Sequence, residues 1–344
     1  MEDKMIKYPK FLQQNDTIGI TAPSDGIIKE FDKIRFDLAC KKLNSLGYKT
    51  IKTDNVEKSS KLVSSSSQER AEQFRNLWSG NDVSMILAVS GGEFLMDMLP
   101  YLDVESIKSS VPKWIQGYSD ISLLNFYLTT NFNIATSTSV NAKSFGMNPW
   151  HKSLENNIEI LKGNEIVQES FDMYQGEWSE DILGNEDAGF NLTDKVEYKN
   201  LYGKSQEKFE GRIIGGCIDV IKTLMGTKFD NTKNFVNSFN EGVIWCIENC
   251  EMSVADLYRA LWQMKQSGWF ENTNGVLVGR TFSSKDMKDF TYLDVLHKIF
   301  DDINVPVVYD IDFGHLAPQW TIINGSYAEF EYENGKGKLL QRMI

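Results

Sequence analysis

The sequence lacks several features that would place it in a specialised class of protein. It has 36 basic residues against 48 acidic ones, a net charge of -12, so no surface for nucleic acid or anionic membranes is expected. No apolar run reaches the length of a membrane-spanning helix. Residues 1–7 contain no apolar core of signal-peptide length. We therefore expect a cytoplasmic protein.

Cysteine and histidine are also scarce. The cysteines at 40, 217, 246 and 250 form no CxxC pair, and the three histidines are distant from them in sequence. We therefore expect reduced, partly buried thiols and no metal site. No GxGxxG motif follows a predicted strand, so no dinucleotide is expected, and nothing else in the sequence indicates a cofactor.

The length and the pattern of the first half predict the fold class. A chain of 344 residues exceeds one ordinary core, so we expect two domains, or one α/β domain with a large appendage. Apolar strand-like runs at 17–21, 48–52, 85–89 and 113–117 alternate with helical patterns. One helix covers 29–46, and a capping box of Ser66 and Glu69 opens the next. The alternation predicts a parallel sheet with helices on both faces.

The second half is expected to contain an insert and further strands and helices. Residues 161–210 are polar and irregular, and their aromatics are consistent with either a lid or a loop packed on the domain beneath. Strands are predicted at 243–247, 275–279 and 306–309, helices at 218–224, 253–266 and 292–300, and hairpin turns at 324–325 and 334–335. We divide the chain into an N-terminal α/β domain (1–165), a linker and insert (166–210) and a C-terminal domain (211–344).

Residues 113–124 (KWIQGYSDISLL) contain the most informative pattern. An apolar strand ends at Gly117 and a helical pattern begins at Ile121, which leaves Ser119 on a sharp turn. Such a turn lifts a hydroxyl clear of the sheet and points the following N–H groups at any anion beside it. Ser119 would be a nucleophile if a base reached it, or else it merely caps the helix. The second glycine of the usual nucleophile elbow is missing.

Three further features are candidates for the same site. Gly91 and Gly92 follow a predicted strand, so they and Ser119 can face one crevice beyond the strand ends. Their amides would suit an oxyanion hole or a carboxylate clamp, or the pair is an ordinary tight turn. Glu248 ends a buried strand and needs a partner, which a helix cap or ion pair would also supply. His315 lies in a glycine-flanked loop, where it could titrate or simply face solvent.

Serine, glutamate and histidine are the residue types that acyl transfer needs. A hydroxyl attacks, an imidazole takes and returns its proton, and a carboxylate orients the imidazole. His151 and His297 suit the role of base less well, because one follows a Pro-Trp loop and the other lies in a helical pattern. We therefore regard Ser119, Glu248 and His315 as one candidate constellation.

These residues belong to segments that recur in a known family. The segments are 18–23 (IGITAP), 91–92, 99–103 (LPYLD), 117–121 (GYSDI), 211–216 (GRIIGG), 247–249 (IEN), 275–279 and 314–315. In this order, over nearly the whole chain, the sequence resembles the LD-carboxypeptidases and microcin C immunity peptidases. These are serine peptidases with a Ser-Glu-His triad.

The resemblance implies roles for individual residues. Ser119 corresponds to the nucleophile, Glu248 to the carboxylate and His315 to the base, with backbone amides near Gly92 and Asp120 as the oxyanion hole. It also implies a cytoplasmic homodimer that hydrolyses an amide next to a carboxylate or an acyl-nucleotide-like group without a metal. The implied fold is an N-terminal parallel α/β domain and a C-terminal, barrel-like, β-rich domain with helices, with the site between them.

The resemblance leaves the substrate open. Segment 90–94 (SGGEF) differs from the one usual in the peptidoglycan-recycling branch. The LPYLD continuation and the long insert with residues 177–179 (EWS) are more similar to the microcin immunity branch, whose insert contributes a tryptophan that stacks on a nucleobase. Trp178 is our candidate for that residue, and Gly91 and Glu93 are candidates for substrate binding. The small-molecule substrate is then an aminoacyl- or peptidyl-nucleotide. The alternatives are removal of D-alanine from murein tetrapeptides in peptidoglycan recycling, or binding without turnover, which the altered segment 93–96 suggests.

Overall fold

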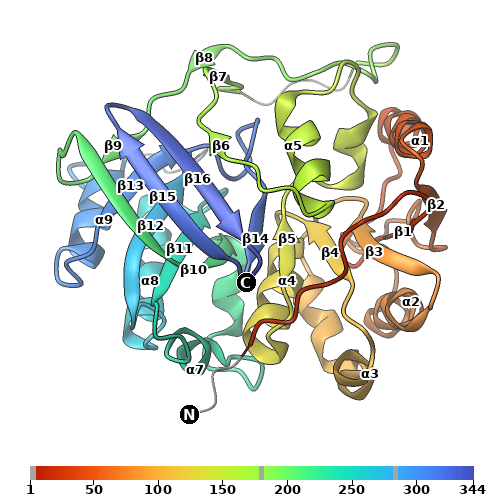
Figure 1. Ribbon diagram of the computed structural model, residues 1–344, viewed down its shortest axis with the longest axis horizontal. Helices are drawn as coiled ribbons and strands as arrows, with labels where there is room; N and C mark the ends of the chain where they lie inside the picture. Colours follow the sequence, from red (N-terminus) through yellow and green to blue (C-terminus); the bar gives the residue numbers. More distant parts are fainter. Residues whose placement is uncertain (1–4, 178–181, 282–285) are drawn as a thin grey trace.

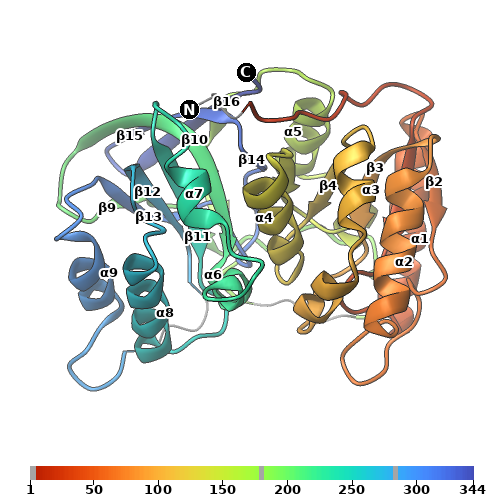
Figure 2. The same ribbon diagram turned by 90° about the horizontal axis from the view of Figure 1, so that it is seen from below.

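The computed structural model describes residues 5–177, 182–281 and 286–344. Two sheets form its framework, and Figure 1 shows the N-terminal half (red to yellow) beside the C-terminal half (green to blue). Figure 2 shows the same two halves from below. Among the described helices, none combines the length and the apolar character needed to cross a membrane.

The N-terminal half contains a sheet whose first five strands in sequence are parallel. The strands are β1 (Thr17–Thr21), β2 (Lys49–Lys52), β3 (Val83–Ala88), β4 (Trp114–Gly117), β5 (Thr136–Thr138) and the antiparallel β14 (Ile322–Asn324), in the order β14-β5-β4-β3-β1-β2. The helices are α1 (Glu30–Ser45), α2 (Ser67–Ser79), η1 (Leu95–Tyr101), α3 (Val104–Ser109), α4 (Ile121–Phe132), η2 (Ala142–Gly146) and α5 (Lys152–Leu161). Strands β1 and β4 are buried throughout, as expected for a covered parallel sheet.

Local sequence signals explain where these helices begin and end. Gly47 has φ +92° and follows α1, so a residue tolerant of left-handed backbone stands where the helix must stop. The capping box of Ser66 and Glu69 is present at the start of α2. The predicted α/β alternation of the first half is confirmed.

The C-terminal half contains a mixed sheet. Its strands are β6 (Gln168–Glu169), β9 (Lys199–Asn200), β10 (Gln206–Cys217), β11 (Val243–Glu248), β12 (Thr273–Gly279), β13 (Val307–Ile311), β15 (Tyr327–Glu333) and β16 (Lys336–Arg342), in the order β6-β16-β15-β10-β11-β12-β13-β9. A separate pair is β7 (Met173–Tyr174) with β8 (Asp194–Lys195), and the helices are α6 (Ile218–Ile221), η3 (Lys222–Leu224), α7 (Thr232–Val236), α8 (Val254–Gln266) and α9 (Tyr292–Phe300). Strands β10 to β13 run parallel, and the expected β-rich domain with helices is confirmed.

One predicted hairpin is wrong. Asn334-Gly335 does join the antiparallel strands β15 and β16. Asn324-Gly325, however, joins β14, which pairs with β5, to β15, which pairs with β10 and β16. An Asn-Gly pair specifies a tight turn, but burial of the flanking strands decides which sheet each one joins.

Each sheet contains strands from distant parts of the chain. Strand β14 completes the N-terminal sheet from the far end of the chain, and β6 and β9 of the insert lie at the edges of the C-terminal sheet. Strand β10 begins at Gln206, so it extends to both sides of the boundary predicted at 210/211. The boundaries at 165/166 and 210/211 stay predictions.

Helix α4 packs directly on the C-terminal half. The ring of Phe126 lies 6.1 Å from that of Trp245 on β11 and 5.2 Å from that of Trp269. A Cβ atom on Gly216 would lie only 2.8 Å from the Cβ atom of Ser122, so glycine is required where β10 approaches α4. This contact fixes the helix after Ser119 relative to the strand that ends at Glu248.

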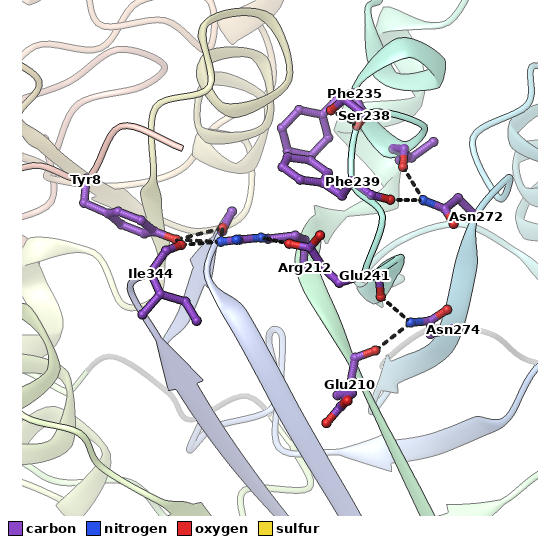
Figure 3. A network of polar contacts seen from close by, with 12 residues as sticks. Tyr8, Glu210, Arg212, Phe235, Ser238, Phe239, Glu241, Asn272, Asn274 and Ile344 are labelled. Carbon is purple, nitrogen blue, oxygen red and sulfur yellow. Dashed lines mark hydrogen bonds and ion pairs between the residues drawn. The ribbon is translucent and has the colours of Figure 1, made fainter. Parts of the chain in front are cut away.

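A polar network ties both ends of the described chain to β10 (Figure 3). Arg212 forms an ion pair of 2.6 Å with Glu241 and donates hydrogen bonds to Tyr8 Oη (3.0 Å) and to the Ile344 carbonyl (2.6 Å). Burial, opposed by Arg212, raises the pKa of Tyr8 to about 12. The phenol therefore stays neutral, and the N-terminal segment is held on the C-terminal half.

Candidate active site

Ser119 lies on the turn between β4 and α4. Its φ is +61°, a left-handed conformation that is uncommon for a residue other than glycine and typical of strained functional turns. A Cβ atom on Gly91 would lie 2.8 Å from the Ser119 Cβ, so only glycine fits beside it. The N-cap of α4 is Asp120, with no side-chain cap, and the Ser119 hydroxyl forms no hydrogen bond within the described residues. The helix-cap interpretation of Ser119 is therefore wrong.

Glu248 and His315 form a buried hydrogen-bonded pair. His315 Nδ1 lies 2.8 Å from Glu248 Oε1 and 3.0 Å from Oε2, and the side chains are only 7% and 2% exposed. The backbone N–H of His315 also donates to Oε2, at 3.3 Å. Gly314 (φ +104°) makes this approach possible, since a Cβ atom there would lie 2.7 Å from Glu248 Cδ.

The surroundings of His315 favour its protonated form. Burial lowers its pKa, but the charge of Glu248 and hydrogen bonds with Cys250 and Glu248 outweigh burial and raise the pKa well above its usual value. The ring of Tyr118 lies 5.1 Å from the imidazole. The pair therefore stabilises an imidazolium, which a general base becomes after it takes a proton.

One cavity, of about 350 Å³, brings these elements together. It lies between the two halves of the molecule and is lined by Ser119 and Tyr118 from one half and His315 from the other. The remaining lining residues are Asp25, Ser90, Gly91, Gly92, Glu93, Asn141, Lys143, Ser144, Cys217, Asp219, Val220, Cys250 and Glu251. The structure thus places Ser119 and His315 in one cavity, with Glu248 hydrogen-bonded to His315. A larger cavity of about 660 Å³ beside His151 and Phe171 contains none of the three.

Two backbone N–H groups near Ser119 are available as donors. Neither Gly92 nor Asp120 uses its N–H in a hydrogen bond within the part of the chain that the structure describes. A Cβ atom on Gly91 would lie 3.7 Å from the Asp120 nitrogen, so the glycine pair lies close to that donor. Free donors of this kind beside a hydroxyl suit an anion that forms there.

Three residues of the site have no sequence signal beyond their position. Asp219 accepts hydrogen bonds from the backbone N–H groups of Cys250 (2.9 Å), Glu251 (2.9 Å) and Met252 (3.2 Å), and so anchors the loop after β11. Cys217 and Cys250 line the cavity as buried thiols that form no disulfide. Burial raises the pKa of both thiols.

Ligand atoms of Cys217, Glu248 and His315 lie within 4.8 Å of one another, a grouping with the donor types of a metal site. The contact of Glu248 with His315 within this group is the hydrogen-bonded pair described above.

Trp178, the candidate for nucleobase stacking, lies outside the described residues. Glu93, the other candidate side chain for substrate binding, lines the cavity.

Fold and site together define a two-domain α/β protein with a serine turn and a histidine–glutamate pair in one interdomain cavity. Similarity to known sequences identifies the family more closely. Residues 18–139 match the N-terminal domain of the LD-carboxypeptidases, and residues 210–330 match their C-terminal domain. The chain belongs to this family.

Two similar proteins cover nearly the whole chain. A Vibrio cholerae protein provisionally named a carboxypeptidase is 29% identical, with 98% of each chain covered. The microcin C7 self-immunity protein of Escherichia coli is 27% identical over 94% of this chain and 92% of its own. The structure of that immunity protein in its wild-type apo state superimposes with a TM-score of 0.80 at 24% identity, covering 99% of both chains. The same protein has been solved with aspartyl sulfamoyl adenosine and with glutamyl sulfamoyl guanosine.

Proposed function

We propose that this protein is a serine hydrolase of the microcin C immunity type, which cleaves the amide of aminoacyl- or peptidyl-nucleotide-like substrates. Its catalytic residues are Ser119, His315 and Glu248. The observation that carries the proposal is the single cavity lined by Ser119 on its strained turn and by an imidazole hydrogen-bonded to a buried carboxylate.

The geometry supports an acyl-enzyme mechanism. His315 accepts the hydroxyl proton as Ser119 Oγ attacks the amide carbon. The carbonyl oxygen becomes an oxyanion, which accepts hydrogen bonds from the backbone N–H groups of Gly92 and Asp120. Glu248 stabilises the imidazolium, which then donates its proton to the leaving amine as the C–N bond breaks. Water, deprotonated by His315, then attacks the ester carbon, and His315 returns the proton to Ser119 Oγ as the C–O bond breaks and the acid product leaves.

The substrate class rests on similarity. The E. coli immunity protein is similar over nearly the full length of both chains, and its structures hold aminoacyl sulfamoyl nucleosides. Gly91 and Glu93 line the cavity and would contact the acyl portion of the substrate, and Trp178 would contact the nucleobase. The family description also supports the second candidate, removal of a terminal D-amino acid from murein tetrapeptides.

The cellular setting is a further part of the proposal. A cytoplasmic location agrees with four cysteines that form no disulfide, three of them buried, since disulfides are rare in reducing compartments. The homodimer expected from the family resemblance is testable by sedimentation equilibrium.

The decisive experiment compares two substrates and one variant. Wild-type protein and Ser119→Ala are incubated with leucyl sulfamoyl adenosine and, in parallel, with a murein LD-tetrapeptide, and products are identified by mass. We expect the wild type to hydrolyse the nucleoside compound with an acyl-enzyme burst, and Ser119→Ala to lose several orders of magnitude in turnover. Equal rates for the two proteins would refute the serine mechanism, and cleavage of the tetrapeptide alone would establish the second candidate. Stoichiometric binding without product would indicate a binding protein.

A further inference from the structure

The cavity that contains Ser119 is strongly acidic. Four carboxylate side chains line it: Asp25 and Glu93 from the N-terminal half, and Asp219 and Glu251 from the C-terminal half. The basic side chains among its described lining residues are already paired, Lys143 with Asp32 at 2.6 Å and His315 with Glu248 at 2.8 Å. These cations therefore do not balance the negative charge of the four lining carboxylates.

Glu93 and Glu251 differ from the other acids of the lining in having no side-chain partner among the described residues. Asp219 is occupied by the backbone N–H groups of the loop after β11, and Asp25 accepts the N–H of Gly26 at 2.8 Å. Within residues 5–177, 182–281 and 286–344, neither the Glu93 nor the Glu251 carboxylate forms a hydrogen bond or ion pair. Two unpaired carboxylates, one from each half, thus border the same cavity.

These carboxylates repel one another. The pKa of Glu93 is raised, first by burial and then by the negative charge of Glu251, with smaller effects from Asp120 and Asp219. Every charge that acts on Glu93 in this way is negative. A cation between the two glutamates would remove that repulsion and make each carboxylate a hydrogen-bond acceptor.

A buried acceptor beside this region also has no donor. Asp120 is 1% exposed, its Oδ2 accepts bonds from Ser24 and Leu95, and its Oδ1 has no hydrogen-bond partner among the described residues. Asp120 lines an adjoining cavity of about 520 Å³ that shares Glu93 and Glu251 with the first. Burying a carboxylate oxygen without a hydrogen bond costs free energy. A hydrogen-bond donor on a ligand would supply the bond that this oxygen lacks.

The adjoining cavity contains cations as well, but they lie away from Ser119. Arg259 is paired with Asp256 at 2.7 Å, and the ammonium of Lys222 lies 3.2 Å from the sulfur of Met252. Neither residue lines the cavity that contains Ser119. The unbalanced negative charge is therefore concentrated next to the nucleophile.

We propose that Glu93 and Glu251 form a subsite for a cationic side chain of the substrate's acyl residue, an ammonium or guanidinium in addition to the α-ammonium that every aminoacyl substrate carries. The proposal rests on the proposed function and deepens it, because it makes the substrate a basic aminoacyl or peptidyl amide. Like charges placed together oppose binding. The aspartyl and glutamyl groups in the ligands of the E. coli relative would therefore be disfavoured here.

Binding to the Ser119→Ala variant tests the subsite separately from catalysis. The ligands are lysyl, leucyl and aspartyl sulfamoyl adenosine, which share the α-ammonium beside the scissile bond and differ in side-chain charge, and Kd is measured by calorimetry. We expect the lysyl compound to bind about 10- to 100-fold more tightly than the leucyl compound, and the aspartyl compound most weakly. Adding Glu93→Gln and Glu251→Gln together should bring the three affinities within about threefold of one another.

A matched control changes the same charge elsewhere. Glu105→Gln removes one negative charge from α3, where the side chain is 87% exposed, and should leave the order of affinities unchanged. Aspartyl or leucyl binding as tight as lysyl binding would overturn the proposal, as would an unchanged order in the double glutamine variant. Binding of Ca²⁺ alone that depends on both glutamates, without lysyl preference, would also overturn it in favour of a metal site.

Failure of the subsite and failure of the proposed function remain distinguishable. If wild-type protein hydrolyses none of the three compounds while Ser119→Ala still prefers the lysyl ligand, the subsite stands and the hydrolase proposal fails. If the wild type hydrolyses the aspartyl compound fastest, the hydrolase stands and the subsite fails.

Discussion

Two buried pairs hold the loop after β13, and they differ in chemistry. On one side, His315 is hydrogen-bonded to Glu248. On the other, the guanidinium of Arg280 lies 2.7 Å from Asp312, with side chains that are 5% and 0% exposed. Arg280 also donates to the carbonyls of Leu316 and Pro318, and Asp312 accepts from Tyr198 and the backbone of Phe171.

The comparison shows which features separate a pair that can take part in chemistry from a purely structural ion pair, here called a brace. In both pairs a carboxylate is buried at or just after the end of a strand, and in both it is paired, as burial of a charge requires. Arginine keeps its proton throughout the accessible pH range, so Arg280 can only position the loop. Histidine exchanges a proton near neutral pH, and His315 faces the cavity that contains Ser119. A titratable partner that faces a cavity, rather than the buried carboxylate itself, indicates the function.

The largest effect is expected on turnover from Glu248→Gln. The amide keeps the shape of the carboxylate but removes the charge that stabilises the imidazolium. We expect kcat/KM to fall by about 10³- to 10⁴-fold, with a thermal midpoint close to that of the wild type. Steady-state kinetics on the substrate found above and a thermal melt measure both quantities. Turnover within tenfold of the wild type would mean that the pair is a brace like its neighbour.

Asp312→Asn should show the opposite pattern. It leaves the charge of Arg280 buried without its counterion, so the free energy of unfolding should fall by about 3–5 kcal/mol. Turnover per folded molecule should fall far less than in Glu248→Gln. Denaturant unfolding measures the loss, and Glu331→Gln, at the exposed pair with Lys208, is the control expected to change little. A stable but inactive Asp312→Asn protein would contradict the assignment of this pair as a brace.

The setting of each candidate residue was predictable because it is local. The strand ending at Gly117 and the apolar helix from Ile121 leave Ser119 on the turn, and the buried strand ending at Glu248 requires a partner for its carboxylate. The glycine before His315 likewise indicates a close backbone approach. These patterns depend on burial and backbone conformation within a few residues.

The rest depends on contacts that no local pattern specifies. Asp219 anchors the loop of Cys250 and Glu251 from another strand end, and nothing in the sequence around it indicates this role. The pairing of β14 with β5 was missed for the same reason, since the turn after it looked like that of a hairpin. Residues that meet through tertiary structure alone, such as Glu93 and Glu251, required the structure.

A smaller effect is expected from Gly314→Ala, which disturbs the functional pair without changing its residues. Alanine would adopt φ +104° and its Cβ would press on Glu248. We expect a loss of stability of about 1–3 kcal/mol and a fall in turnover greater than this loss alone explains. Gly203→Ala is the matched control, because Gly203 (φ +69°) has nothing within 4 Å of its added Cβ, so it should lose stability but not turnover. Equal turnover in the two variants would show that the spacing of Glu248 and His315 is not critical.

The smallest effect is a shift along the pH axis. Because the folded-state pKa of His315 is raised, the pair adds stability that is fully present below the pKa of an unfolded histidine, about 6.5, and is lost as pH rises through the folded-state value. The neutral base appears over that same higher range, so kcat/KM should rise with pH above the usual histidine range.

NMR titration of the imidazole measures this shift directly, and with three histidines in the chain the signals can be assigned by substituting His151 and His297. Glu248→Gln removes the charge that raises the pKa of His315 and leaves burial, which lowers it, so the midpoint should move to lower pH. Asp301→Asn, beside the exposed His297, should leave the His315 midpoint in place. If His315 titrated at the same pH with and without the Glu248 charge, the two pairs would differ only in location, and the chemical distinction between them would be lost.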